Sequence, residues 1–173
     1  MKHERARREP TYEAPWGRAL IVSSALVVVL LGGLSAGGLW VTMVKHQPIL
    51  IRLATLLPLA LVAACLPFVV RGYTVTPDSI LVHRLFWDTY LPRIGLQTAC
   101  VEPNAMRGSI RTFGNGGGFS FTGLYYNGRL RTYRAFVTDL HRTVVLRYSS
   151  RTVVLSPAAP EAFVRELAVP ASP

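Results

Sequence analysis

The sequence predicts a two-helix transmembrane hairpin followed by a mainly-β barrel or sandwich that one C-terminal α-helix caps. Two long apolar runs, residues 19–44 and 49–70, are separated only by the turn 45–48. The stretch 71–168 then alternates between apolar and polar positions and is interrupted by turn residues, as in a domain of short strands. An amphipathic segment with prolines at both ends closes this domain, and residues 169–173 form a tail.

The N-terminal arm, residues 1–18, is basic and contains Pro10 and Pro15, so we expect it to be flexible. Lys and Arg concentrate at the outer ends of the two apolar runs rather than at the turn between them. Such asymmetry keeps the basic flanks in the cytoplasm. We therefore expect a two-pass protein of a bacterial inner (plasma) membrane, with the N-terminus and the C-terminal domain both cytoplasmic. The basic flanks comprise Lys2, Arg5, Arg7, Arg8, Arg18, Arg71 and Arg84, against Lys45 and Arg52 near the turn.

The first apolar run, residues 19–44, carries no charge and would extend about 39 Å as a helix. The hydrocarbon core of a bilayer is about 30 Å thick, so the run can cross it. It is too long for the apolar region of a signal peptide, which has about 7–15 residues. Gly33 and Gly37 have the spacing of closely packed helices, which predicts packing against the second run or, alternatively, a homo-oligomer.

The second apolar run, residues 49–70, has one charge, Arg52, three residues after its start. An arginine so close to the end of a span can extend to the headgroups, so we interpret it as an interfacial anchor. Pro58 and Pro67 predict kinks, because proline lacks the N–H that continues a helix.

The region after residue 71 predicts seven or eight short strands. Pro77-Asp78 closes the first hairpin, and Asn127-Gly128 is typical of a two-residue turn. The glycine-rich loop at residues 114–118 joins two further strands. The predicted strands are residues 73–76, 79–84, 86–91, 109–113, 119–126, 130–137, 143–148 and 152–155.

The last element is a helix that begins near Pro160, with Glu161 in its first turn. Phe163, Val164 and Leu167 fall on one face of this helix. An open sheet edge or barrel mouth requires a cover, so we expect this face to close the β domain.

Three stretches of the domain resemble the bacterial pleckstrin-homology-like (PH-like) domain proteins. They are G-S-I-R-T-F-G-N-G-G at residues 108–117, Y-R-A-F-V-T-D at 133–139, and the segment 153–164 that leads into the helix. The resemblance covers roughly residues 71–168 and implies membrane helices joined to a seven-stranded barrel-like sandwich with a C-terminal helix. It implies little about a ligand, because such folds host many functions. Ala159 departs from the pattern, where a helix-capping side chain is expected.

The chain carries a net charge of +10, and a basic surface beside a bilayer attracts anionic headgroups. Two arginines on one strand face can form a fork for phosphate oxygens, and glycine-loop N–H groups can form an anion-binding nest. The alternatives are a solvated basic face and a flexible strand connection. The candidate headgroup residues are Arg107, Arg111, Asn115, Gly116, Gly117, Arg131 and Arg134.

The sequence contains no constellation that demands an enzyme. Its four histidines are scattered, and Cys65 and Cys100 form no CxxC pair, so we expect no metal site, no cofactor and no catalytic residue. A domain attached to a bilayer meets lipid before nucleic acid, so we expect no nucleic-acid partner. The predicted function is a non-catalytic protein-interaction, scaffolding or regulatory module with a membrane or cytoplasmic protein partner. The alternative is an anionic headgroup-binding domain that uses the Arg107/Arg111 face and the loop 114–118.

Overall fold

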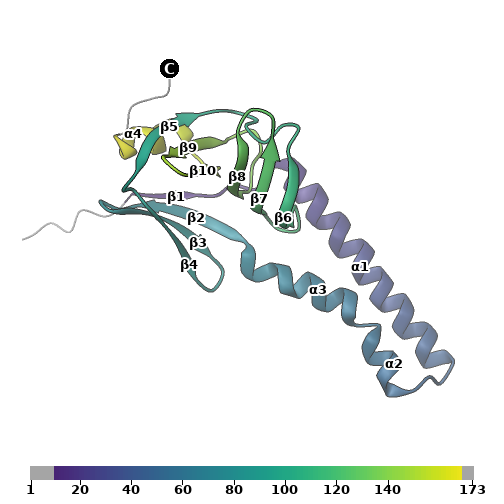
Figure 1. Cartoon of the computed structure of the whole chain (residues 1–173). Coiled ribbons are helices and arrows are strands. Elements are labelled where there is room, and N and C mark those ends of the chain that lie inside the picture. The colour runs from purple at the N-terminus through teal and green to yellow at the C-terminus, as the bar shows by residue number, and fades with distance from the viewer. Residues whose placement is uncertain (1–9, 169–173) are drawn as a thin grey trace, which may run out of the picture.

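A computed structural model describes residues 10–168 as a β-sandwich from which two apolar helical segments extend (Figure 1). Sheet A has the strand order β1-β2-β3-β4, and sheet B has the order β5-β9-β10-β8-β7-β6. The β8–β10 pair is parallel, and the other described pairs are antiparallel. The strands are β1 Thr11–Glu13, β2 Val70–Val75, β3 Ser79–Arg84, β4 Asp88–Pro92, β5 Leu96–Val101, β6 Ile110–Gly116, β7 Phe121–Asn127, β8 Arg131–Val137, β9 Val144–Tyr148 and β10 Thr152–Leu155.

The two apolar runs form helices that lie side by side. The first is α1, Arg18–Val44; the second divides into α2, Ile49–Ala54, α3, Leu57–Cys65, and the 3₁₀ turn η1, Leu66–Phe68. The breaks fall just before Pro58 and at Pro67, where the missing proline N–H cannot continue the hydrogen-bond ladder. By length and composition, Arg18–Val44 and Ile49–Phe68 could each cross a membrane. The Nε of Arg52 turns back toward the connecting turn and donates to the Gln47 carbonyl over 3.0 Å.

Part of the N-terminal arm belongs to the domain, which corrects the expectation of a flexible arm over residues 10–18. Strand β1 extends sheet A by pairing with β2, with Tyr12 opposite Tyr73. The Tyr12 ring packs edge-on against Phe163 at 5.2 Å between centroids, and Ala14 is buried. The charged arm thus contributes Tyr12 to the core, which its basic composition did not indicate. Residues 1–9 lie outside the described part of the chain. The apolar helices are therefore an insertion between the first two strands of sheet A.

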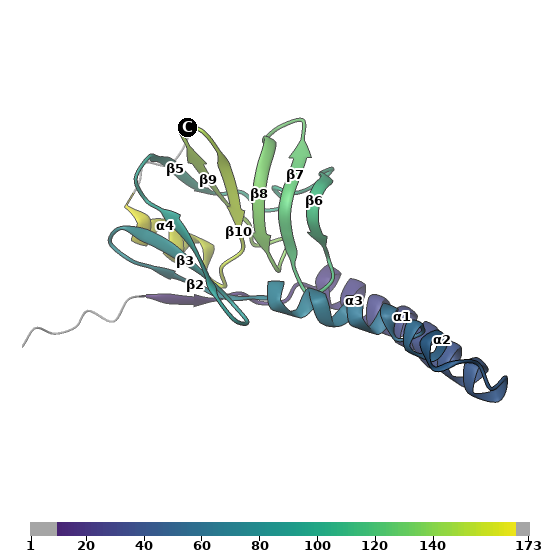
Figure 2. The ribbon, with the colours of Figure 1, turned by 60° about the horizontal axis from the view of Figure 1, so that its bottom comes forward.

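The helical segments are attached to sheet B at both of their domain ends. At the start of α1, the Gly17 N–H donates to the Thr138 carbonyl over 2.9 Å. Six residues later, Ser23 Oγ donates to the Gly117 carbonyl over 2.7 Å. At the other end, Ser120 Oγ donates to the Phe68 carbonyl over 3.0 Å. Both attachments lie on the side of the sandwich where β6, β7 and β8 stand, opposite α4 (Figure 2).

The glycines of α1 pack differently from the prediction. A Cβ added to Gly38 would lie 3.0 Å from Thr55 Cγ2, whereas one added to Gly33 or Gly37 would meet no atom within 4 Å. Gly38, rather than Gly33 and Gly37, therefore makes the close contact with the second helical segment. A homo-oligomer through Gly33 and Gly37 stays a prediction.

The β domain follows the predicted order with two local differences. Strand β5 was not predicted, because its segment alternates weakly and contains two adjacent polar residues, Gln97 and Thr98, in its first half. The turn after β7 contains three residues rather than two, since Asn127 pairs with Arg131. The Asn127 Oδ1 accepts the N–H groups of Arg129 and Leu130, and Arg131 rather than Gly128 has the positive φ, 59°.

Helix α4, Pro160–Leu167, closes one end of the sandwich as predicted. Phe163 and Leu167 are fully buried, and Val164 is half-buried against the same core. Ala159 at the N-cap makes no side-chain hydrogen bond, as its methyl group requires. The core between the sheets also contains Tyr73, Ile80, Val82, Leu91, Phe136, Leu146, Val153 and Leu155.

Candidate functional site

A cleft of about 630 Å³ opens where the second helical segment meets the sheets. Its walls come from the end of the second helical segment and from residues of β3, β6, β7 and β8. Three arginines and several apolar side chains share this space. The lining residues are Ala64, Cys65, Phe68, Arg84, Arg111, Phe113, Gly114, Asn115, Thr122, Gly123, Leu124 and Arg134.

Arg84 is the most constrained of the three arginines. It ends β3, whose side chains alternate so that Ile80, Val82 and Arg84 face the interior, and only 7% of Arg84 is exposed. Its Nε donates to Thr89 Oγ1 over 3.0 Å, but its buried Nη1 has no hydrogen-bond partner. Burying a guanidinium group with an unpaired nitrogen lowers the stability of the fold. The same nitrogen is available to donate a hydrogen bond to an anion.

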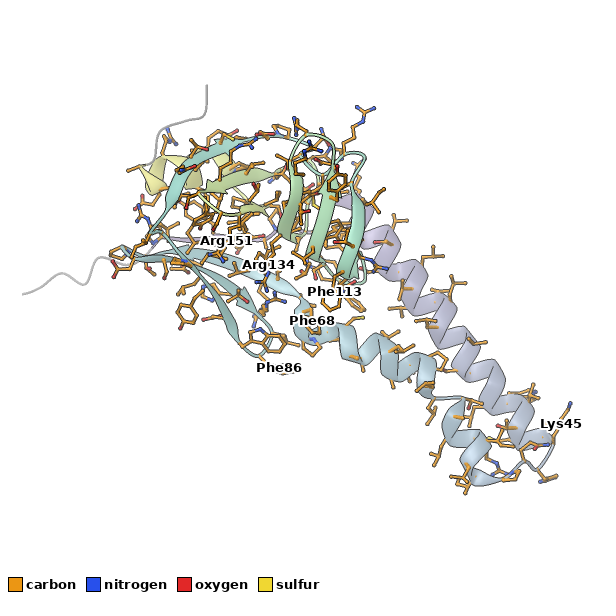
Figure 3. The ribbon with its side chains drawn as sticks, viewed as in Figure 1. Lys45, Phe68, Phe86, Phe113, Arg134 and Arg151 are labelled. Carbon is orange, nitrogen blue, oxygen red and sulfur yellow. The ribbon has the colours of Figure 1, made fainter. Side chains whose placement is uncertain are left out.

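Aromatic rings surround the Arg84 guanidinium group. Its Cζ lies 5.1 Å from the ring centroid of Phe136, 5.7 Å from Phe68 and 5.8 Å from Trp87. These rings stabilise the cation through their π faces and fix its position. Phe68 closes the second helical segment, so Arg84 lies where that segment meets the sheets, as Figure 3 shows for the neighbouring Phe68 and Arg134.

Arg134 and Arg111 bring two more positive charges to the cleft. Arg134 projects from β8, with its Cζ 5.1 Å from the Phe136 ring, so two arginines contact the same aromatic side chain. Arg111 on β6 donates from Nη1 to the Gly114 carbonyl over 3.1 Å. None of the ion pairs formed within residues 10–168 includes Arg84, Arg111 or Arg134. The cleft therefore concentrates positive charge that no described carboxylate neutralises.

The electrostatics of Arg84 agree with this geometry. Burial lowers the pKa of Arg84 from its ordinary value, and the charge of Arg134 lowers it further. Both effects mean that the folded protein disfavours the positive charge at this position. An anion between the two arginines would reverse the balance, because it would pair with the charge and satisfy the free Nη1.

The remaining walls make the cleft amphiphilic. Phe68, Phe113 and Leu124 add apolar surface to the lining beside the three arginines. Gly114 and Gly123 pair across β6 and β7, and a Cβ on either would come within 2.4 Å of a backbone atom of the opposite strand. The absence of side chains at these positions allows the two backbones to approach. Such a cleft suits a ligand with an anionic head and an apolar body.

The predicted site residues divide between this cleft and other surfaces. Arg111, Asn115 and Arg134 line the cleft. Arg107 lies beside Gly128 and Arg129 in a separate surface depression. The structure therefore separates Arg107 from Arg111, which were expected to form one fork. Gly116 and Arg131 also lie outside the cleft, and Arg131 Nη1 donates to the Tyr126 hydroxyl on an exposed surface.

The glycine loop has a structural role that the sequence did not indicate. The Gly117 carbonyl accepts hydrogen bonds from Ser23 and Ser24 of α1. The N–H of Gly117 donates to the Ser120 carbonyl, and the N–H of Gly118 donates to Asn115 Oδ1. These N–H groups are already used, so the loop holds α1 instead of offering the expected anion-binding nest.

Sequence reasoning missed Arg84 as a site residue and assigned it only to the basic flank. The signal was present in the alternation of β3, which places every second residue on the interior face. A charge in phase with Ile80 and Val82 contradicts the pattern of a buried strand face, and such a contradiction points to a functional position.

The described residues contain no group of three or more His, Cys, Asp or Glu that could hold a metal ion. The Cys100 thiol is protected rather than activated, because burial and a hydrogen bond to Glu102 raise its pKa to about 11.

Comparison with known proteins identifies the family. The sequence model of the family described as Bacterial PH domain matches residues 71–170, which is more than half of the chain. No curated protein and no solved structure matches significantly. The two-sheet sandwich and its C-terminal helix agree with this match. The chain therefore belongs to the bacterial PH domain family.

Proposed function

We propose that this protein is a two-pass membrane protein whose non-catalytic PH domain binds the phosphate of an anionic lipid headgroup at the cytoplasmic face. The observation that carries the proposal is the buried, unpaired Nη1 of Arg84 in a cleft with two further arginines that form no ion pair with a described carboxylate. The cleft begins where the second helical segment ends, which is the depth of the headgroups if that segment crosses the bilayer.

The exposure of the two helical segments supports membrane anchoring. Leu26, Val29 and Leu50 are among many large apolar side chains exposed along them. A helix buried in a soluble core would cover such side chains, and an exposed apolar surface of this extent is unfavourable in water. The distribution of basic residues supports a cytoplasmic domain.

The amphiphilic lining favours a lipid over a free phosphate. Three arginines can pair with the phosphate oxygens, and Phe68, Phe113 and Leu124 can contact the glycerol and acyl chains. The charge balance favours an anionic headgroup over a zwitterionic one, because a choline cation would meet the same arginines. The protein-interaction role expected from the sequence is the alternative outcome of the test below.

The test titrates the purified full-length chain in a neutral detergent and measures binding by calorimetry. The probes are dioctanoyl phosphatidylglycerol, dioctanoyl phosphatidylcholine, sn-glycerol 3-phosphate and inorganic phosphate. Arg84→Gln is expected to weaken phosphatidylglycerol binding at least tenfold, because each hydrogen bond to a charged group contributes about 1.5–3 kcal/mol. Arg107→Gln is the matched control, since it removes the same charge outside the cleft.

Each arm of the titration has a distinct meaning. Equal binding of inorganic phosphate and phosphatidylglycerol would assign the cleft to a free anion. Equal losses of phosphatidylglycerol binding in Arg84→Gln and Arg107→Gln would show that binding depends on the general surface charge and not on the cleft. If none of the four probes binds, the lipid assignment is wrong, and the cleft becomes a candidate surface for an anionic protein segment.

A further inference from the structure

The connection between β3 and β4 carries an exposed apolar tip. It consists of Leu85, Phe86 and Trp87, of which Phe86 is 74% exposed and Trp87 43% exposed. Hairpin connections of soluble domains usually have polar residues, so three consecutive apolar ones require an explanation. The connection lies outside the hydrophobic core, whose last residue on β3 is Val82.

The tip is attached to the end of the second helical segment. Trp87 packs edge-on against Phe68 at 5.6 Å between ring centroids, and the Arg84 guanidinium group contacts both rings. Across the cleft, Phe113 on β6 is also 74% exposed. Figure 3 shows Phe86, Phe68 and Phe113 together on the side of the domain from which the helices leave. The tip and Phe113 therefore continue the apolar surface of the second segment onto the domain.

We propose that residues 85–87 and Phe113 form a rim that enters the lipid interface beside the second span. This proposal rests on the membrane anchoring proposed above and adds that the domain lies against the bilayer instead of projecting from it. The occupant is lipid, because the rim is continuous with Phe68, the last residue of the apolar segment. Aromatic side chains also favour the interface between hydrocarbon and headgroups.

The rim has a consequence for the arginine cleft. Phe68 and Phe113 line the cleft and also belong to the apolar surface that faces the bilayer. A lipid would therefore enter the cleft sideways from the leaflet, with its phosphate moving toward Arg84 while its acyl chains stay among the rim residues. Entry from the aqueous side would require the whole lipid to leave the membrane first.

Fluorescence quenching in vesicles with brominated acyl chains tests the rim. The chain has three tryptophans, Trp16, Trp40 and Trp87. Phe86→Trp in a background with all three changed to Phe reports on the tip. Ile94→Trp in the same background is the matched control, because Ile94 is 88% exposed but lies in the turn between β4 and β5, at the other end of β4. A variant that retains only Trp40 reports on insertion of α1.

The expected result is quenching of the Phe86→Trp and Trp40 reporters by brominated lipid, with Ile94→Trp unquenched but accessible to aqueous iodide. The fluorescence of the Phe86→Trp reporter should fall at least twofold. The quenching should be strongest for bromines near the carbonyl end of the lipid acyl chain. If Trp40 is quenched while Phe86→Trp responds only to iodide, the rim proposal is overturned and the anchoring stands. If Trp40 is also unquenched, the membrane anchoring itself fails, and with it the rim.

A second variant measures the rim without a fluorescent reporter. Phe86→Asp is expected to reduce co-purification of long-chain anionic lipid at least threefold, while Ile94→Asp leaves it unchanged. Binding of the water-soluble dioctanoyl lipid in detergent should stay equal to that of the unaltered chain, because Phe86 does not line the cleft. Loss of both kinds of binding would contradict a role in lipid entry from the leaflet.

Discussion

Two buried polar groups at opposite ends of the sandwich interior differ in their hydrogen bonding. At the closed end, beneath α4, the Tyr73 hydroxyl donates to the Phe136 carbonyl over 2.7 Å and accepts the Ser156 N–H. At the open end, the Nη1 of Arg84 is buried without a partner. Phe136 lies between them, bonded through its backbone to Tyr73 and contacted through its ring by Arg84.

This difference indicates that one end of the core stabilises the fold and the other end is suited to bind a ligand. A satisfied buried hydroxyl fixes the arrangement of the strands, whereas an unsatisfied buried cation costs stability and gains a partner only when an anion arrives. The closed end is filled by the aromatic side chains of Tyr12, Tyr73 and Phe163. The open end keeps a cleft because the second helical segment, rather than α4, covers it.

The largest expected effect is at the closed end. Phe163→Ala removes a fully buried aromatic side chain from between the sheets and should lower the free energy of unfolding by about 3–5 kcal/mol. Chemical denaturation followed by near-ultraviolet circular dichroism measures the loss, with the exposed Ile94→Ala as control. Lipid binding per folded molecule should be unchanged, since Phe163 contacts Tyr73 whereas Arg84 and Arg134 contact the Phe136 ring. A binding loss in the folded variant would contradict the division of the core into two ends.

Alkaline pH should also lower the stability contributed by the closed end. Burial raises the pKa of Tyr73 from 10 in the unfolded chain to about 12 in the folded protein. The folded state then retains a proton that the unfolded state has lost, so the stability present below pH 10 falls between pH 10 and 12. The slope contributed by this group is about 1.4 kcal/mol per pH unit. Denaturation from pH 8 to 11 should give a shallower decline for Tyr73→Phe; an equal decline would show that Tyr73 is not the group that titrates.

At the open end, Arg84→Met should separate the two properties. Replacing a buried, unpaired charge with an apolar side chain is neutral or stabilising, so we expect the free energy of unfolding to stay constant or rise by about 1 kcal/mol. Lipid binding should fall at least tenfold in the same variant. A loss of more than about 2 kcal/mol in denaturation experiments would instead make Arg84 part of the structural core.

The smallest expected effect concerns the element that closes the sandwich. Ala159→Asp provides a side-chain acceptor for the first N–H groups of α4 and a negative charge at its N-terminus. The expected gain in unfolding free energy is about 1 kcal/mol, measured by the same denaturation, with Ala159→Asn as the uncharged comparison. No gain in either variant would show that the N-terminus of α4 does not limit the stability of the closed end.

Several elements were predictable because their signals are local. The apolar runs, the strand alternation and the amphipathic face of Phe163, Val164 and Leu167 each arise from residues close together in the chain. Strand β1 was missed because its pairing partner, β2, follows the whole helical insertion. The three-residue turn at Asn127 was missed because its Nδ2 also donates to the Ala105 carbonyl, a long-range contact that no turn motif indicates.

The candidate site was only partly predictable for the same reason. Composition indicated a basic surface, and Arg111 and Arg134 were both among the candidate headgroup residues; the structure places both in the lining of the cleft. Arg107 was grouped with Arg111 because both were expected on one strand face, but β6 begins at Ile110 and Arg107 precedes it. Arg84 joined the site through the packing of β3 against β8, which brings together residues that are far apart in the chain.

The sequence by itself determined the local elements: two apolar helical segments, a series of short alternating strands and one amphipathic helix. These follow from the spacing of apolar residues, which each segment carries in its own order. Tertiary structure alone decided that β1 and β2, which flank the helices in sequence, pair with each other. It also decided that the glycine loop holds α1 and that Arg84, Arg111 and Arg134 share one cleft. The physical reason is that burial and the pairing of charges depend on which segments pack together. Local sequence patterns do not specify this long-range packing.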